Sequence, residues 1–97
     1  MPLVEVPARN FHRVQFPGPP APRVVVKVEA TRPVFTHVLN GNEFERFRSG
    51  GSFRPVRSTP PDTYHRYDVH IPVWQPWVLV IGNPNTEMVS VHFEVFA

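Results

Sequence analysis

Proline is the residue type that most restricts how this chain can fold, because 13 prolines are spread through its 97 residues. Each proline lacks a backbone N–H and clashes with the preceding helical turn, so long helices are excluded nearly everywhere. Short runs rich in Val, Phe and Tyr lie between Pro, Gly and Asn residues. This arrangement is typical of antiparallel all-β proteins. We therefore predict an all-β fold, a small antiparallel β-sandwich (jelly-roll-like) of about seven short strands with one short helix near residues 42–50.

The N-terminal region differs from the rest of the chain. Residues 3–6 and 11–16 are weak strand candidates, and residues 17–22 (PGPPAP) have the composition of a stiff, polyproline-like linker. We predict an N-terminal arm and Pro-rich linker over residues 1–22, followed by the β-sandwich domain over residues 23–97. Such an arm can pair with a neighbouring subunit.

Alternation of apolar and other residues predicts the first strands of the domain. Residues 23–29 place Val24, Val26 and Val28 on one face. Residues 33–39 place Phe, His and Leu on one face and Val, Thr and Val on the other. The segment between these two strands, residues 30–32, is predicted to be a tight turn.

The C-terminal half predicts three further strands. Residues 64–71 and 88–96 alternate, with an apolar face directed inward. Residues 77–81 are apolar on both faces, so they should form a central strand that is covered on two sides. Residues 82–87 (GNPNTE) have the composition of a hairpin loop.

The only helical signal covers residues 42–50. Asn42 can cap backbone N–H groups with Glu45 three residues later, as in a capping box. Phe44 and Phe47 share a face, and the following Gly-Gly pair can end the helix in a left-handed conformation. We expect one or two turns of helix lying on the sheet, followed by an irregular, Pro-rich stretch over residues 55–62.

Composition limits the compartment and the chemistry. The chain has no cysteine, which excludes disulfides and thiolate metal sites. No signal sequence opens it and no apolar run could span a membrane, so we expect a cytoplasmic protein with no membrane partner, and an exported or virion-borne protein is the alternative. Nine of the ten basic residues are Arg, which together with the proline content fits a thermophilic habit or a biased base composition.

Two local patterns in the middle and at the end of the chain can be compared with known sequences. Their residues are Asn42, Phe44, Phe47, Gly50, Gly51, Ser52 and Phe53, and the run from Trp77 to Pro84 (WVLVIGNP). These patterns resemble a family of short bacterial β proteins of unknown function that are sometimes fused to TIR domains. The resemblance covers roughly residues 23–97, and the fold that it implies is a compact β-sandwich with no known chemistry. The chain departs from the family pattern over residues 55–61, where more glycine would be expected.

No pattern of catalytic or metal-ligating residues is present. The five histidines lack the spacings that bring two imidazoles to one ion, although His70 and His92 could meet across a sheet face. Glu43 and Glu45 lie near the predicted start of the helix, where acidic side chains interact favourably with the positive end of the helix dipole. No serine sits in a strand–turn–helix elbow, and the Gly-Gly pair follows a helix rather than preceding one. We therefore expect no enzyme activity, no metal and no cofactor.

Arginines interleaved with aromatic residues are the most suggestive binding feature. Guanidinium groups can meet phosphates while aromatic rings stack on bases, although a solvated surface is an equally ordinary role for such residues. An exposed Trp in a Pro-flanked turn favours a partner or a sugar face. The candidate ligand- or partner-binding residues are Arg9, Arg13, Arg23, Arg46, Arg48, Arg54, Arg57 and Trp74.

These features predict a non-catalytic binding or assembly module. The leading hypothesis is a homo-oligomeric structural or interaction protein that self-associates through its N-terminal arm and an edge strand. One alternative is a β-sandwich module that recognises a carbohydrate or a nucleotide. The other is a salt-dependent nucleic-acid binder that uses the Arg-rich arm and cluster, and an acidic partner protein would satisfy the same arginines.

Overall fold

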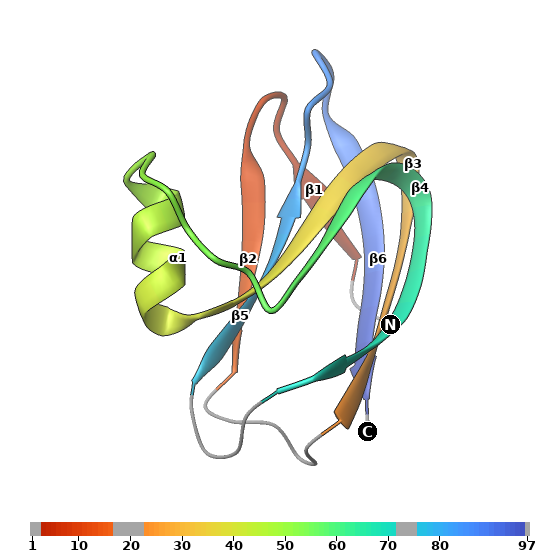
Figure 1. Ribbon diagram of the computed structural model, residues 1–97. Coiled ribbons are helices and arrows are strands. Elements are labelled where there is room, and N and C mark those ends of the chain that lie inside the picture. Colours follow the sequence, from red (N-terminus) through yellow and green to blue (C-terminus); the bar gives the residue numbers. More distant parts are fainter. Residues whose placement is uncertain (1–2, 17–22, 72–75, 97) are drawn as a thin grey trace.

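The computed structural model describes residues 3–16, 23–71 and 76–96 (Figure 1). The predicted linker over residues 17–22 and Trp74 lie outside the described residues. Six strands and one helix follow in the order β1 (Leu3–Val6), β2 (Phe11–Phe16), β3 (Arg23–Asn40), α1 (Gly41–Arg48), β4 (Arg57–His70), β5 (Trp77–Gly82) and β6 (Val89–Phe96). The chain is therefore all-β with one short helix, as the sequence predicts.

One antiparallel sheet curls onto itself to make the sandwich. The strand order is β1-β6-β3-β5-β2, and β4 pairs with the other side of β3. The first half of β3 pairs with β6 and its second half pairs with β5, while β4 follows both halves. Figure 1 shows β3 and β4 bending over together. One layer therefore contains β1 and β6, the other contains β2 and β5, and β3 and β4 belong to both.

The bend replaces the predicted turn at residues 30–32. These residues continue β3, and Ala30 still pairs with Val91 of β6. Against β4 the register shifts between Glu29 and Val34 and again between Val34 and Thr36. Such irregularities insert extra residues while pairing continues on either side, and they increase bending and twist. The turn prediction was wrong because residues 30–32 fold as an irregular part of one strand.

The predicted irregular stretch at residues 55–62 is also largely strand. From Arg57 onward these residues form the start of β4, including Pro60 and Pro61. Among the described strands β4 pairs only with β3, so it is an edge. Proline is tolerated there because a missing N–H can face the unpaired side. The same prolines lie where the β3–β4 register shifts.

The apolar faces predicted from alternation form the core between the two layers. The buried cluster joins side chains from β1, β3, β4, β5 and β6. All six residues of β5 are buried, because the core covers one face and the α1 region covers the other. The central-strand prediction for residues 77–81 is thus confirmed. The largest fully buried residue of the core is Trp77, whose ring stacks on the Phe16 ring with centroids 4.2 Å apart.

A small polar network is buried inside the bend. The Thr36 hydroxyl, which is fully buried, lies 2.8 Å from the Tyr67 hydroxyl and 2.6 Å from the Thr59 hydroxyl. Burial raises the pKa of the Tyr67 phenol above its ordinary value, so it stays protonated at neutral pH. Nearby, His65 Nε2 lies 2.6 Å from the Val34 carbonyl oxygen. These contacts satisfy polar groups that would otherwise be costly to bury.

Residues 3–16, predicted as part of a separate arm, contribute an edge strand to each layer. β1 pairs with β6, and β2 pairs with β5. Val6 is fully buried, and Val4, Val14 and Phe16 pack against the core. The physical reason is that alternation gives both strands an apolar face, which the open sides of the sandwich can cover.

Candidate functional site

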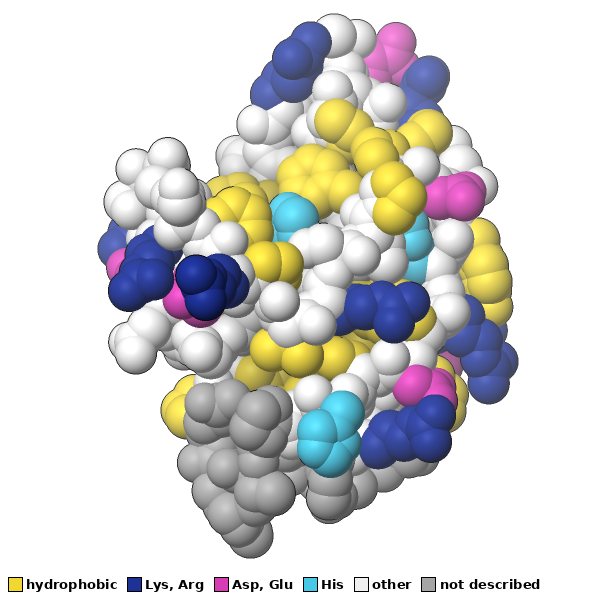
Figure 2. Space-filling view, viewed as in Figure 1, with side chains coloured by type: hydrophobic (Ala, Val, Ile, Leu, Met, Phe, Trp, Pro, Cys, Tyr) yellow, Lys and Arg dark blue, Asp and Glu magenta, His cyan; other side chains and the backbone are white. Residues whose placement is uncertain are grey.

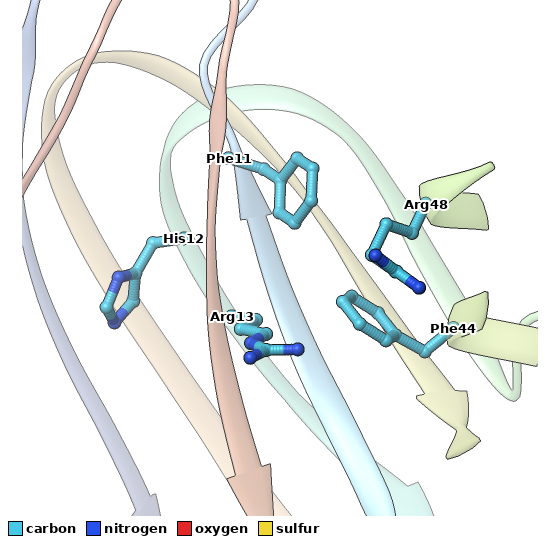
Figure 3. A pocket seen from close by; sticks show the side chains of 5 residues that line it. All are labelled: Phe11, His12, Arg13, Phe44 and Arg48. Carbon is cyan, nitrogen blue, oxygen red and sulfur yellow. The ribbon is translucent and has the colours of Figure 1, made fainter. Parts of the chain in front are cut away.

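A surface pocket of about 490 Å³ lies between β2 and α1 (Figure 3). Its lining residues are Phe11, His12, Arg13, Phe44 and Arg48. Two of the arginines singled out in the sequence, Arg13 and Arg48, therefore line the same pocket, although they lie far apart in the chain.

The pleat of β2 sorts its side chains between the two faces of the layer. Phe11 and Arg13 project toward α1, whereas His12 projects to the opposite side of the strand (Figure 3). There the His12 ring lies 6.0 Å from the Phe93 ring. Burial lowers the pKa of His12 below its ordinary value of 6.5, so its imidazole is neutral at pH 7. The chemistry of the pocket on the α1 side comes from the other four residues.

Helix α1 begins where β3 ends. Asn40 has an extended backbone, and its side-chain oxygen accepts a hydrogen bond of 2.8 Å from the backbone N–H of Glu43. The predicted capping box of Asn42 and Glu45 was wrong, because the chain turns into the helix two residues earlier. The predicted stop is confirmed, since Gly50 has the positive φ of 82° that favours glycine. Capped at this point, α1 lies across the outer face of β5 and β3.

Aromatic rings form the floor of the pocket. Phe44 is buried, and the Phe11 ring meets it edge to face with centroids 6.2 Å apart. Phe47 extends the contact, 5.1 Å from Phe11 and 5.2 Å from Phe53. Gly82 makes room in the same face, because a Cβ there would lie 2.0 Å from the ring of Phe35. The rings hold α1 against the sheet and exclude water from one side of the pocket.

The pocket carries an excess of positive charge. The Arg13 guanidinium lies over the Phe44 ring, 5.5 Å from its centroid. No carboxylate of the described residues forms a salt bridge with Arg13. Arg48 pairs with Glu45 at 2.5 Å, and both side chains are more than half exposed. Exposed pairs of this kind are weak, so an incoming anion can compete with Glu45.

The other candidate arginines do not line this pocket. Arg46 pairs with Glu43 on α1, and the same carboxylate accepts the backbone N–H of Arg54. Arg23 pairs with Asp68, and the Arg57 guanidinium lies over the Tyr67 ring at 5.0 Å.

Arg9 lies in the turn between β1 and β2, with a positive φ of 59°. Figure 2 shows Lys and Arg side chains spread over the visible face rather than gathered in one patch. The sequence cluster around α1 is therefore divided among several local contacts.

A second opening lies on the other face of β2. It has a volume of about 240 Å³ and is lined mainly by apolar residues. The lining comes from β2 and from the second half of β6, namely Val14, Phe16, Phe93, Glu94 and Val95. β2 therefore separates a basic, aromatic pocket from an apolar opening.

The histidines of the strands do not gather. His70 stands opposite Arg23, and His92 stands opposite Leu3 and Glu29. Within residues 3–16, 23–71 and 76–96, no group of three His, Cys, Asp or Glu residues is placed to hold a metal ion. In the same part of the chain, no helix is long and apolar enough to cross a membrane.

Sequence reasoning missed Phe11, His12 and Phe44 as lining residues. The alternation in residues 11–16 does place Phe11 and Arg13 on one face. The proximity of that face to α1 depends on β2 pairing with β5, for which the chain has no local signal.

Comparisons with solved structures found the same architecture. The crystal structure of Yersinia pseudotuberculosis-derived mitogen is similar with a TM-score of 0.66 at 10% identity, over 98% of this chain and 81% of that chain. The solution structure of a de novo designed double-stranded β-helix has a TM-score of 0.57 at 14% identity, over 97% and 95% of the two chains. At such identities the likeness shows the fold alone.

No family model and no curated protein matches the chain. The resemblance to the short bacterial β proteins stays a prediction.

Proposed function

We propose that this protein is a non-catalytic binding module that captures an anionic group of its partner in the pocket between β2 and α1. The observation that carries the proposal is the position of Arg13. Its guanidinium is held over Phe44, beside Arg48, and no carboxylate of the described residues neutralises it.

The chemistry of the lining suits a carboxylate or a phosphate. A guanidinium offers several N–H donors in a planar fork that matches either group, and charge-assisted hydrogen bonds are the stronger ones. The contact with the Phe44 ring limits the motion of the Arg13 side chain before binding. Less conformational entropy is therefore lost when a ligand binds. The aromatic floor lowers the local dielectric and strengthens the attraction.

The same geometry favours binding over catalysis. Besides Arg13 and Arg48, the only titratable side chain of the lining is His12, which projects to the other side of β2 (Figure 3). A general acid or base must reach the proton that it transfers, and His12 is not placed to act on a group held by the two arginines.

Self-association through an N-terminal arm, the leading hypothesis from the sequence, loses its main support. Residues 3–6 and 11–16 pair within the chain as β1 and β2, so their backbone groups already have partners on one side. The free edge that this hypothesis also requires is present, since β2 has a neighbour on one side only among the described strands.

Titration with two anions, followed by amide NMR spectra, tests the proposal. Inorganic phosphate and N-acetylaspartate should shift the amide signals of Phe11, Arg13, Phe44 and Arg48. Arg13→Gln should weaken binding about tenfold by removing a charge-assisted contact. Arg66→Gln is the matched control. Arg66 is an exposed arginine of β4 that pairs with Lys27 in the part of β3 beside β6, away from the pocket between β2 and α1. Equal losses in the two variants would mean general electrostatic attraction and would refute the pocket.

A further inference from the structure

β2 is the one edge of this sandwich that is both long and regular among the described strands. Its six residues pair with β5 in unbroken register. The edge formed by β4 contains Pro60 and Pro61 and shifts its register, and the edge strand β1 has only 4 residues. Prolines, bulges, shortness and charged side chains are the usual protections of sheet edges. β2 has only the last of these, in Arg13.

An edge strand offers backbone N–H and C=O groups to an added strand. Every second residue directs these groups away from its existing partner, so an extended peptide can pair beside β2 and continue the layer. The peptide's side chains would then alternate between the two faces of the layer.

The two faces beside β2 select different side chains. The peptide side chains on the α1 side would meet Arg13 and Arg48 over an aromatic floor. The peptide side chains on the core side would meet the apolar opening beside Val14, Phe16 and Phe93, where the carboxylate of Glu94 disfavours an acidic residue. Charge and polarity therefore favour acidic residues toward α1 and apolar residues toward the core.

A second copy of this chain fits this edge poorly. In a dimer, β2 would pair antiparallel with β2 of the other copy, with matching faces on the same side. The Arg13 and Arg48 guanidinium groups of both copies would then lie close together at the interface. Like charges at neighbouring cross-strand positions repel. The charge of the edge is better matched by a partner that carries acidic residues.

We propose that the free edge of β2 binds an extended segment of another protein in which acidic and apolar residues alternate. This inference rests on the proposed function, because Arg13 and Arg48 take the acidic side chains. A strand rises about 3.3 Å per residue, so a peptide of about seven residues spans β2.

The probe is a capped peptide of alternating valine and aspartate, about seven residues long, and it is measured by calorimetry against the whole chain. Two further peptides carry N-methyl groups, one on every aspartate nitrogen and the other on every valine nitrogen. All aspartate N–H groups of a strand point to one edge and all valine N–H groups to the other. One methylated peptide should therefore lose at least about tenfold in affinity, while the other binds like the parent.

Side-chain controls test the selection by the two faces. An asparagine-for-aspartate peptide should bind at least about tenfold more weakly, and Arg13→Gln should reduce binding of the parent while Arg66→Gln leaves it unchanged. Hydrogen exchange should show new protection of β2 amides when the parent peptide is bound.

Three results would overturn the inference. If both methylated peptides bind equally while phosphate still shifts the pocket amides, strand addition is wrong and the proposed function stands. If neither phosphate nor any peptide binds, both proposals fall. If the chain alone sediments as a dimer whose formation protects β2 amides, a second copy is the occupant of this edge.

Discussion

Asn83 is the polar side chain whose replacement should show most clearly how the sandwich closes. It is buried, and its Nδ2 lies 3.0 Å from the Val6 carbonyl oxygen, 3.2 Å from that of Pro7 and 2.8 Å from that of Glu87. Its Oδ1 accepts the backbone N–H of Asn85 at 2.9 Å. One amide group thus ties the end of β1 to the loop between β5 and β6.

Asn83→Asp keeps the shape and removes the donor. At pH 7 it would place a carboxylate oxygen against three carbonyl oxygens in a buried position. The two donors of Asn85 still face the other carboxylate oxygen. A buried charge without an opposite charge costs about 3–5 kcal/mol, and the three carbonyls also lose their donor. We expect the free energy of unfolding to fall by about that amount, with β1 losing hydrogen-exchange protection before β3.

The loss should depend on pH in a defined direction. Burial beside carbonyls raises the folded-state pKa of the introduced carboxyl above its unfolded value of about 3.9. A protonated carboxyl can again donate one hydrogen bond. The deficit of the variant relative to the parent protein is therefore smallest below about pH 4 and grows as pH rises through the folded pKa.

Urea unfolding of the parent and the variant, followed by tryptophan fluorescence at several pH values, measures this difference. Asn42→Asp is the matched control, because Asn42 is exposed in the first turn of α1, where a negative charge is favourable. A loss under about 1 kcal/mol at pH 7, or a deficit that does not change with pH, would refute the reasoning.

Two further predictions concern the interior. Thr36→Val should cost about 1–3 kcal/mol in urea unfolding, because it leaves the Tyr67 hydroxyl without its buried partner and leaves the Thr59 hydroxyl with only the backbone N–H of residue 36. Adding Tyr67→Phe should cost less than the sum of the single changes. Burial lowers the pKa values of His12 and His37, so unfolding takes up protons and stability should fall as pH drops through 6.5. The double variant His12→Gln and His37→Gln should show a shallower fall, and an unchanged pH profile would contradict this assignment.

Much of the fold could be predicted because strand alternation is a local signal. The two-residue period of a strand is enough to place Val24, Val26 and Val28 on one face, and all three are buried in the structure. The bend of β3 could not be read in the same way. Residues 31–33 (TRP) have turn-like composition, and only the pairing of the residues on either side of them, Ala30 with β6 and Glu29 and Val34 with β4, distinguishes a bulged strand from a turn.

The candidate site was predictable in part. Arg48 stood out because it belongs to a group of arginines interleaved with aromatic residues, and Arg13 stood out because it belongs to the basic N-terminal arm. Their convergence depends on contacts between segments far apart in the chain, namely β2 with β5 and α1 with the outer face of β5. Arg46 and Arg54 looked equivalent to Arg48, but the Arg46 side chain pairs with Glu43, the backbone N–H of Arg54 donates to the same carboxylate, and neither residue lines the pocket.

The pairing of β1 with β6 has a consequence for synthesis on the ribosome. Val4 of β1 stands opposite Val91 of β6, so the first of the described strands to be synthesised cannot pair until the last one has been synthesised. The β3–β4 ladder joins neighbouring segments and can form earlier, but the layer beside it stays incomplete until β6 emerges. During that interval the apolar side chains of β1 and β2 are uncovered. Until β1 and β6 pair, these uncovered apolar side chains favour aggregation of the nascent chain.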